Sequence, residues 1–270
     1  MEGTRAQRPR RSGAQYRPEH TEAGHAGGCH AVRKTAVRLI VAVFVLLWLA
    51  PVGAADLSRE DVVALLAEAE EDRPDLSNRD LSALDLSALD FRGADLFAAK
   101  LDAADLTNAN LAGANLTRAL LRGAKLPGAK LSGANLFAVV MDGADLTDAD
   151  LSGSRIVGAM NGANLTGANL EKADMGADMA NQGMVPARLE LEGAILDGAN
   201  LSGSNLVHAV MRFSKLRGAR LTAARLMWAD LSGADLTGAE VAQADFTNAQ
   251  LGGAVLGDLR GTDSAVGLAD

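Results

Sequence analysis

Cysteine and histidine are scarce in this 270-residue chain, and their positions exclude several kinds of catalytic site. The only cysteine is Cys29, and three of the four histidines, His20, His25 and His30, lie within the first 30 residues. With His208 alone beyond that point, the rest of the chain has no zinc site made of Cys and His and no Cys/His catalytic pair. No motif supports a Ser/His/Asp triad or a nine-residue calcium-binding repeat. We expect no enzymatic activity, no cofactor and no metal ion.

Basic residues are outnumbered, most clearly after residue 55. Eight of the 26 Lys and Arg residues and three of the 34 Asp and Glu residues precede residue 56, which leaves 18 basic and 31 acidic residues and a formal charge of −13. Such a balance favours solubility and disfavours non-specific binding to nucleic acid or anionic membranes.

The chain has one long apolar run, Leu39 to Ala50. Basic residues, among them Arg33 and Arg38, precede the run, and small residues ending at Ala55 follow it. A positive flank, about a dozen apolar residues and a small-residue exit are the three parts of a secretory signal peptide. We therefore expect cleavage after Ala54 or Ala55 and export to the periplasm or the extracellular space.

An uncleaved membrane anchor over residues 39–55 is the alternative. A bilayer-spanning helix needs about 20 apolar residues, and Pro51 shortens this run, so we favour the signal peptide. Membrane contact is expected only through this segment. The basic region before the run is long for a signal peptide, and translation from Val32 would shorten it. A peptide from upstream of Val32 would exclude that start.

A five-residue repeat dominates the chain after residue 75. Its central apolar residues recur every five positions from Leu76 to Ile156 and again from Leu191 to Leu256. Five residues rotate a helix by about 140°, so these side chains would not form a stripe on a helix. On a flat strand they would alternate between the two faces. The pattern instead predicts short strands separated by corners. The central residue, such as Leu96, and the small residue two before it, Ala94, then face the interior of a coil.

The run ADLTN-ANLAG-ANLTR, from Ala104 to Arg118, resembles the pentapeptide-repeat family. The resemblance covers nearly everything from Asp75 to about Asp258. It implies an all-β solenoid, a right-handed quadrilateral parallel β-helix with four repeats, or about 20 residues, in each coil. Relatives in this family dimerise end to end, so the resemblance also implies a homodimer as one assembly to test.

The repeat is interrupted twice and is flanked by two other segments. Ile156 to Met160 is a step of four residues, and regular spacing is lost over residues 176–190. A surface loop and a distorted half-coil, with Met179 and Met184 facing inward, both fit the second interruption. We therefore expect residues 1–55 to form the basic region and signal peptide, 56–74 an N-terminal capping helix, 75–258 the β-helix, and 259–270 a tail with no cap.

Exposed aromatic residues are otherwise absent, so the few at outward positions are candidate protein-contact residues. Stacking of positions 20 apart predicts one column in the first block and another in the last block. The alternative is that neighbouring aromatic residues merely stack to steady adjacent coils. The candidate residues are Phe97, Phe137, Val157, Val207, His208, Phe213, Met227 and Trp228.

Our first hypothesis is an exported, non-enzymatic scaffold that binds an unidentified protein partner. The resemblance implies an alternative, an acidic rod that mimics DNA and binds a topoisomerase such as DNA gyrase. The outward columns of acidic residues are interrupted by Lys125 and Arg155, so neither is an unbroken acidic stripe. Basic residues form belts round single coils, from Arg118 to Lys130 and from Arg212 to Arg225. Because a nucleic-acid site needs a continuous basic stripe, we expect no nucleic-acid partner.

Overall fold

The computed structural model describes residues 56–68, 74–178 and 187–268. These residues belong to one compact unit, residues 51–270. The predicted signal peptide, its cleavage site and the anchor alternative lie outside the described residues, as do Met179 and Met184. Within the described ranges, no helix is long and apolar enough to cross a membrane.

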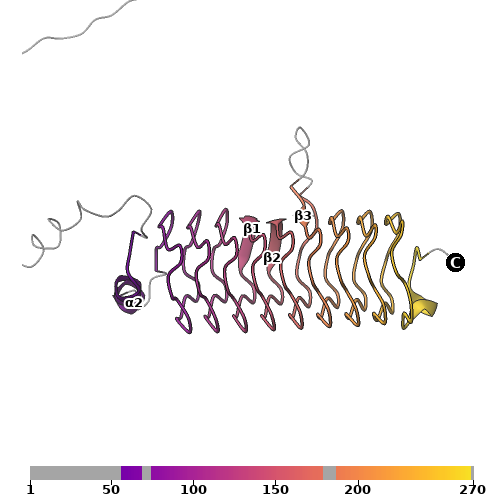
Figure 1. The fold of residues 1–270 in the computed structure, drawn as a ribbon, viewed down its shortest axis with the longest axis horizontal. Coiled ribbons are helices and arrows are strands. Elements are labelled where there is room, and N and C mark those ends of the chain that lie inside the picture. Colours follow the sequence, from indigo (N-terminus) through magenta and orange to yellow (C-terminus); the bar gives the residue numbers. More distant parts are fainter. Residues whose placement is uncertain (1–55, 69–73, 179–186, 269–270) are drawn as a thin grey trace, which may run out of the picture. The chain divides into compact units, whose positions relative to one another are not determined.

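Parallel β-bridges join residues 20 positions apart and define the sides of each coil. Four ladders of bridges, named first to fourth here, begin with the pairs Asp75–Asp95, Asp80–Lys100, Asp85–Asp105 and Asp90–Asn110. A tight turn separates each bridge from the next, so a coil has four short sides and four corners (Figure 1). The quadrilateral parallel β-helix predicted from the sequence is confirmed.

The turn at each corner explains the composition of the repeat. In one corner the amide of Ala99 donates to the carbonyl of Leu96 at 3.0 Å, and Ala98 between them has φ 53°. A positive φ at the second central residue is typical of a type II turn, in which glycine is favoured. The residue before the centre is Asp or Asn because its side chain accepts a turn amide, as Asp95 Oδ1 does from Phe97 N at 3.0 Å.

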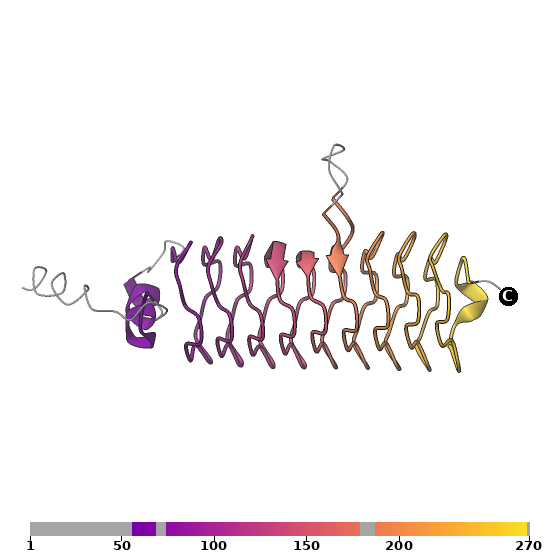
Figure 2. The ribbon, with the colours of Figure 1, turned by 45° about the horizontal axis from the view of Figure 1, so that its top comes forward.

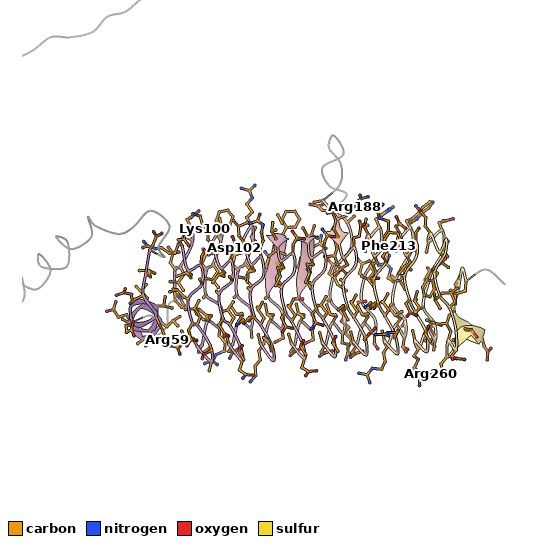
Figure 3. All side chains as sticks on the ribbon, in the orientation of Figure 1. Arg59, Lys100, Asp102, Arg188, Phe213 and Arg260 are labelled. Atoms are coloured by element: carbon orange, nitrogen blue, oxygen red, sulfur yellow. The ribbon has the colours of Figure 1, made fainter. Side chains whose placement is uncertain are left out.

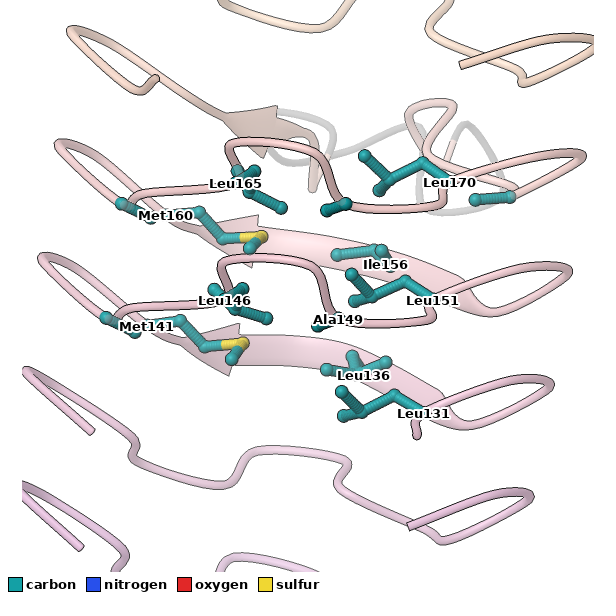
Figure 4. Packing of buried hydrophobic residues seen from close by; sticks show 14 of the residues in the cluster. Leu131, Leu136, Met141, Leu146, Ala149, Leu151, Ile156, Met160, Leu165 and Leu170 are labelled. Carbon is teal, nitrogen blue, oxygen red and sulfur yellow. The ribbon is translucent and has the colours of Figure 1, made fainter. Parts of the chain in front are cut away.

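In most repeats a leucine and an alanine two residues before it fill the interior. Leu96 and Leu116 are at most 1% exposed, and Ala94 and Ala114 are fully buried. Each fully buried leucine contributes about 1.5–3 kcal/mol of hydrophobic stabilisation. Like residues stack from coil to coil, and Figure 4 shows three such columns: Met141 with Met160, Leu146 with Leu165, and Leu151 with Leu170.

The turn aspartates make stability depend on pH. Hydrogen bonds from the hydroxyl and the amide two residues on lower the pKa of Asp85, Asp105 and Asp235. An aspartate whose pKa is lower in the folded state stabilises the fold at pH values above its unfolded-state pKa of about 3.9. This stabilisation is lost as the pH falls through the folded-state pKa. We expect the melting temperature to fall as the pH decreases from about 5 to about 3. A midpoint that stayed constant or rose over this range would contradict the prediction.

Helix α2, Arg59–Glu68, covers the first coil, as the predicted capping helix should. Its N-terminus has the expected capping box, in which Asp61 N donates to Ser58 Oγ at 3.2 Å and Ser58 N donates to Asp61 Oδ2 at 2.9 Å. Val62 is fully buried against the end of the core. Arg59 pairs with Asp85 at 3.0 Å, which ties the helix to the wall of the solenoid.

The four-residue step shortens one corner. Bridges that span it, such as Asp145 to Asn164, join residues 19 apart instead of 20. Here β1 (Asn135–Val140), β2 (Arg155–Ala159) and β3 (Leu189–Glu190) form a parallel sheet with a bulge between Phe137 and Val139 (Figure 2).

The second interruption is an insertion in one corner. Bridges across it, such as Asn169 to Asn200, join residues 31 apart, which is 11 more than in a regular coil. An antiparallel bridge between Asp178 and Ala187 closes its base. The stacking of coils therefore continues past the insertion.

The described part of the C-terminal tail, up to Leu268, packs on the end of the solenoid, and our expectation of a tail with no cap was wrong. After the 3₁₀ helix η1, Thr262–Ser264, Val266 pairs with Asp245, and Leu268 packs against the core. Gly261 and Gly267 have positive φ and lie so close to the last coil that a Cβ would meet its backbone. The two glycines thus allow the tail to lie across the end of the solenoid.

Candidate functional site

The insertion lies in the corner between the first and second ladders, which we call the loop corner. The first ladder runs through Asn135, Arg155, Asp174, Asn205 and Arg225, with steps of 20, 19, 31 and 20 residues. Both aromatic columns predicted from the sequence follow this ladder by two or three residues, and so they occupy the same corner. The candidate residues in this corner are Phe97, Phe137, Val157, Val207, His208, Met227 and Trp228.

Bulky side chains occupy left-handed backbone positions in this corner. Arg118, His208 and Trp228 each have φ 62° at the second turn residue. At the other three corners this position is most often glycine, as in Gly113 and Gly123. A left-handed conformation costs a non-glycine residue about 1 kcal/mol, so the loop corner keeps these side chains at some cost in stability.

Two aromatic contacts link adjacent coils. His208 and Trp228 are stacked, with ring centroids 6.1 Å apart and an interplanar angle of 19°. The guanidinium of Arg118 lies 5.9 Å from the centroid of the Phe97 ring. Stacking between coils was our alternative interpretation of these residues, and it is present here. Trp228 nevertheless remains 54% exposed, so its ring is also open to a partner.

The other candidate residues differ in exposure. Phe213 lies at the next corner and is 63% exposed, with its ring so close over Gly233 that a Cβ there would lie 2.6 Å from it. Phe97, Phe137, Val207 and Met227 are half-buried. Val157, in contrast, is fully buried and is not part of an exposed column. It pairs with Phe137 of β1 and lies with Ala187 at the base of the insertion, outside the cluster of core residues.

A groove runs along the side that adjoins the loop corner, C-terminal to the insertion. Its floor is formed by Val210, Asp230 and Gln250 of the second ladder, and its walls include His208 and Trp228 at the loop corner. Figure 3 shows Arg188 and Phe213 in the coils of this region. The groove has a volume of about 300 Å³. We call it the side groove, and its lining residues are Arg188, His208, Val210, Arg212, Trp228, Asp230, Asn248 and Gln250.

Carboxylates outnumber guanidinium groups in and beside the side groove. Arg212 Nη2 lies 2.5 Å from Glu192 Oε2, while its Nε lies 3.9 Å from Asp230 Oδ2. Arg188 Nε lies 4.0 Å from Glu190 Oε1. Two guanidinium groups thus pair with three carboxylates. Arg212 lies closer to Glu192 than to Asp230, so the Asp230 carboxylate is the more weakly paired of the two.

A second hollow, of about 310 Å³, lies on the other side of the insertion base. It is lined mainly by Ala138, Val157, Gly158, Ala159 and Ala187, with Arg188 and Glu190 at one side. The loop corner therefore offers a small apolar hollow before the insertion and a polar groove after it.

The basic belts pair with carboxylates of adjacent coils. Arg122 lies 3.4 Å from Asp102, and Arg217 pairs with Asp197, lowering the pKa of that carboxyl. Such exposed pairs contribute little stability individually, but they relieve repulsion between stacked carboxylates. Lys125 and Arg155 interrupt the acidic ladders as expected. Among the described residues, no group of three or more His, Cys, Asp or Glu could hold a metal ion.

Comparison with known proteins places these features in a family. A family model for pentapeptide repeats matches 8 copies, over residues 75–113, 99–136, 114–153, 141–176, 189–222 and 224–263. A search of curated proteins gave no match. Among solved structures, the chain is similar to HetL, a pentapeptide repeat protein involved in heterocyst differentiation regulation from the cyanobacterium Nostoc sp. strain PCC 7120. The identity is 28%, over 76% of this chain and 94% of HetL, with a TM-score of 0.44.

Two further structures are also similar. Rfr23 from the cyanobacterium Cyanothece 51142 is 30% identical over 40% of this chain and 63% of its own, with a TM-score of 0.32. QnrB1, a plasmid-mediated fluoroquinolone resistance protein, is 22% identical over 64% of this chain and 91% of its own, with a TM-score of 0.36. Because the family model matches most of the solenoid, repeat by repeat, the chain belongs to the pentapeptide-repeat family of right-handed quadrilateral β-helices.

Proposed function

We propose that this protein is a non-enzymatic scaffold that binds a partner protein through its loop corner. One observation carries the proposal: the register of the bridges brings both aromatic columns and the insertion to a single corner. Exposed aromatic residues are enriched among the residues that dominate binding at protein interfaces. In the repeats described here, the left-handed positions of His208 and Trp228 favour a role in binding over a role in stability.

We further propose that the scaffold acts outside the cytoplasm, in the periplasm or beyond. The apolar run Leu39 to Ala50, with its basic flank and small-residue exit, supports export. Cell fractionation with N-terminal mass determination tests this. A chain that begins at Ala55 or Asp56 outside the cytoplasm is the expected result, and an uncleaved chain in the soluble cytoplasm would overturn it.

Polar substitution of the aromatic residues should weaken partner binding without loss of the fold. Each replacement is the residue found at the same turn position in a neighbouring coil of this corner. Thr117 is the model for Phe97→Thr and Phe137→Thr, and Asn248 is the model for Trp228→Asn. Loss of a central aromatic residue typically costs 2 kcal/mol or more of binding free energy, so the triple variant should bind at least about tenfold more weakly. Its melting temperature should change little, because the three side chains lie on the surface of the loop corner, half-buried or exposed, and outside the core.

Crosslinking can measure this before the partner is identified. A photoreactive group on Asn248→Cys, in a Cys29→Ser background, should capture a partner in cells, and the triple variant should abolish the adduct. Gln243→Cys, at the same turn position on another corner with φ 59°, is the matched control. Equal adducts from both positions, or adducts unaffected by the triple variant, would exclude the loop corner.

DNA mimicry is the second candidate, because the formal charge of −13 after residue 55 favours it. Lys125 and Arg155 break the acidic ladders, so the stripe that a DNA mimic needs is incomplete. Inhibition of gyrase supercoiling by the purified protein would support this alternative over the scaffold. A homodimer is a further assembly to test by mass in solution, since Val255 and Val266 are exposed near the end of the solenoid.

A further inference from the structure

We propose that the side groove binds an extended basic segment of the partner, with a lysine or arginine side chain lying on Trp228 and paired with Asp230. The inference rests on the proposed scaffold function and gives the partner its chemistry. The side groove combines an exposed aromatic side chain, Trp228, with a partly open carboxylate, Asp230.

The dimensions of the groove suit an extended segment. Val210, Asp230 and Gln250 are bridge neighbours in successive coils, so the floor spans two steps of about 4.8 Å. An extended chain rises about 3.3 Å per residue, and the floor therefore covers about three residues of a bound segment. His208 and Trp228 stand along one wall and Arg212 along the other. Side chains of the segment would meet an aromatic wall and a polar floor.

The charges at the groove select a cation. Asp230 Oδ1 accepts from Ser232 N at 3.0 Å and from Ser232 Oγ at 2.6 Å, while Oδ2 has only the distant Arg212 at 3.9 Å. Oδ2 can therefore take a further charged donor. The two guanidinium groups that line the groove, those of Arg188 and Arg212, already pair with Glu190 and Glu192 beside it, so an acidic segment would meet Asp230 without a free cation. The excess of acidic residues in the solenoid also steers a basic partner towards this surface.

The indole of Trp228 is the second group that we expect to bind the cation, beside the Asp230 carboxylate. A cation within about 6 Å of an aromatic centroid is attracted by the ring, most strongly by tryptophan. The loop corner already contains one such contact within the chain, between Arg118 and Phe97. At Trp228 the next coil supplies Asn248 instead of a cation, so this place is open to the partner.

Fluorescence of Trp228 gives a direct test. The chain has two tryptophans, so Trp48→Phe in the full chain leaves Trp228 as the sole reporter. The probe is the peptide acetyl-Gly-Lys-Leu-Lys-Gly-amide, compared with its glutamate analogue acetyl-Gly-Glu-Leu-Glu-Gly-amide. We expect saturable quenching by the lysine peptide, at least tenfold weaker binding of the glutamate peptide, and weaker binding of the lysine peptide at higher salt.

Asp230→Asn should lower the affinity for the lysine peptide at least fivefold. The variant keeps the turn, because Asn200 holds Ser202 in another coil by the same two hydrogen bonds, at 3.2 and 2.7 Å. Asp148→Asn removes one charge from an exposed turn on a different corner and should change nothing. If both variants lowered the affinity equally, the effect would come from net charge alone, and the proposal would be overturned. Equal binding of the lysine and glutamate peptides would overturn it too.

The outcomes separate this inference from the scaffold function. If Asn248→Cys captures a partner while the lysine peptide does not bind, the groove assignment fails and the scaffold function stands. If no partner is captured at that position, the scaffold function fails as well.

Discussion

Gly158→Ala should destabilise the protein by about 3 kcal/mol, far more than alanine at an ordinary turn glycine. Gly158 has φ 143°, which is outside the range that other turn residues in this chain adopt. A Cβ at this position would collide with the carbonyl oxygen, nitrogen and carbonyl carbon of Val139. These are backbone atoms held by the pairing of β1 and β2, so the clash cannot be relieved by a side-chain rotation.

Two controls isolate the cause. Gly143→Ala places a Cβ at φ 67° with nothing within 4 Å, and should cost only about 1 kcal/mol. Adding Val139→Ala to Gly158→Ala should not restore stability, because the variant keeps the backbone that clashes. Urea and thermal unfolding measure both effects. Equal losses from Gly158→Ala and Gly143→Ala would show that the shortened corner tolerates a side chain and would contradict our account.

Gly158 lies between two larger residues at the same position of the neighbouring coils. The small residue before the centre is Ala119 and Ala209 in regular coils, but in the three central coils it is Val139, Gly158 and Leu189 in turn. Gly158 pairs with both of its larger neighbours. The atoms that a Cβ at Gly158 would meet are nevertheless backbone atoms of Val139, so the close approach of β2 to β1, and not the size of the neighbouring side chains, requires the glycine.

The five-residue repeat predicted a coil of short strands with a leucine and alanine interior, because neither a helix nor a flat strand buries every central residue. The four-sided, right-handed form was implied by the family resemblance and not by the period. Leu96 and Ala94 are buried as the pattern required. The tail was misjudged because its packing depends on close approaches at Gly261 and Gly267, which no periodicity reveals. Which backbone atoms lie beside each glycine depends on the register between the tail and the preceding coil. The sequence alone does not give that register.

The site was predicted in part. Exposure of Phe213 and Trp228 follows from their outward positions in regular coils, and both are exposed. Burial of Val157 did not follow, because Val157 lies beside the base of the insertion, where the regular repeat is lost. The grouping of the two columns in one corner was also missed, since positions 97 and 207 are five and a half regular coils apart. Only the lengths of the two interruptions, one residue missing and 11 added, bring them together.

The cap at the N-terminal end is as necessary to the solenoid as its interior. An uncovered first coil would expose apolar side chains and unpaired backbone groups. Helix α2 meets this need with one fully buried side chain, Val62, while the adjacent Val63 is 43% exposed on the other face of the helix. The two valines are therefore a matched pair for testing the cap.

Val62→Asp should detach the helix and open the first coil, whereas Val63→Asp should change stability by no more than about 0.5 kcal/mol. Both variants add the same charge to the same helix, so only burial separates them. Coils contact mainly their neighbours, and we expect the opening to stay local. Hydrogen exchange measures it: the Leu76 amide, bonded to Asp95 O at 2.8 Å, should exchange about 100-fold faster in Val62→Asp, or about 3 kcal/mol. Amides near Leu151 should keep their protection. Unchanged exchange at Leu76 would mean that the first coil is stable without its helix, and that α2 is free to serve another purpose.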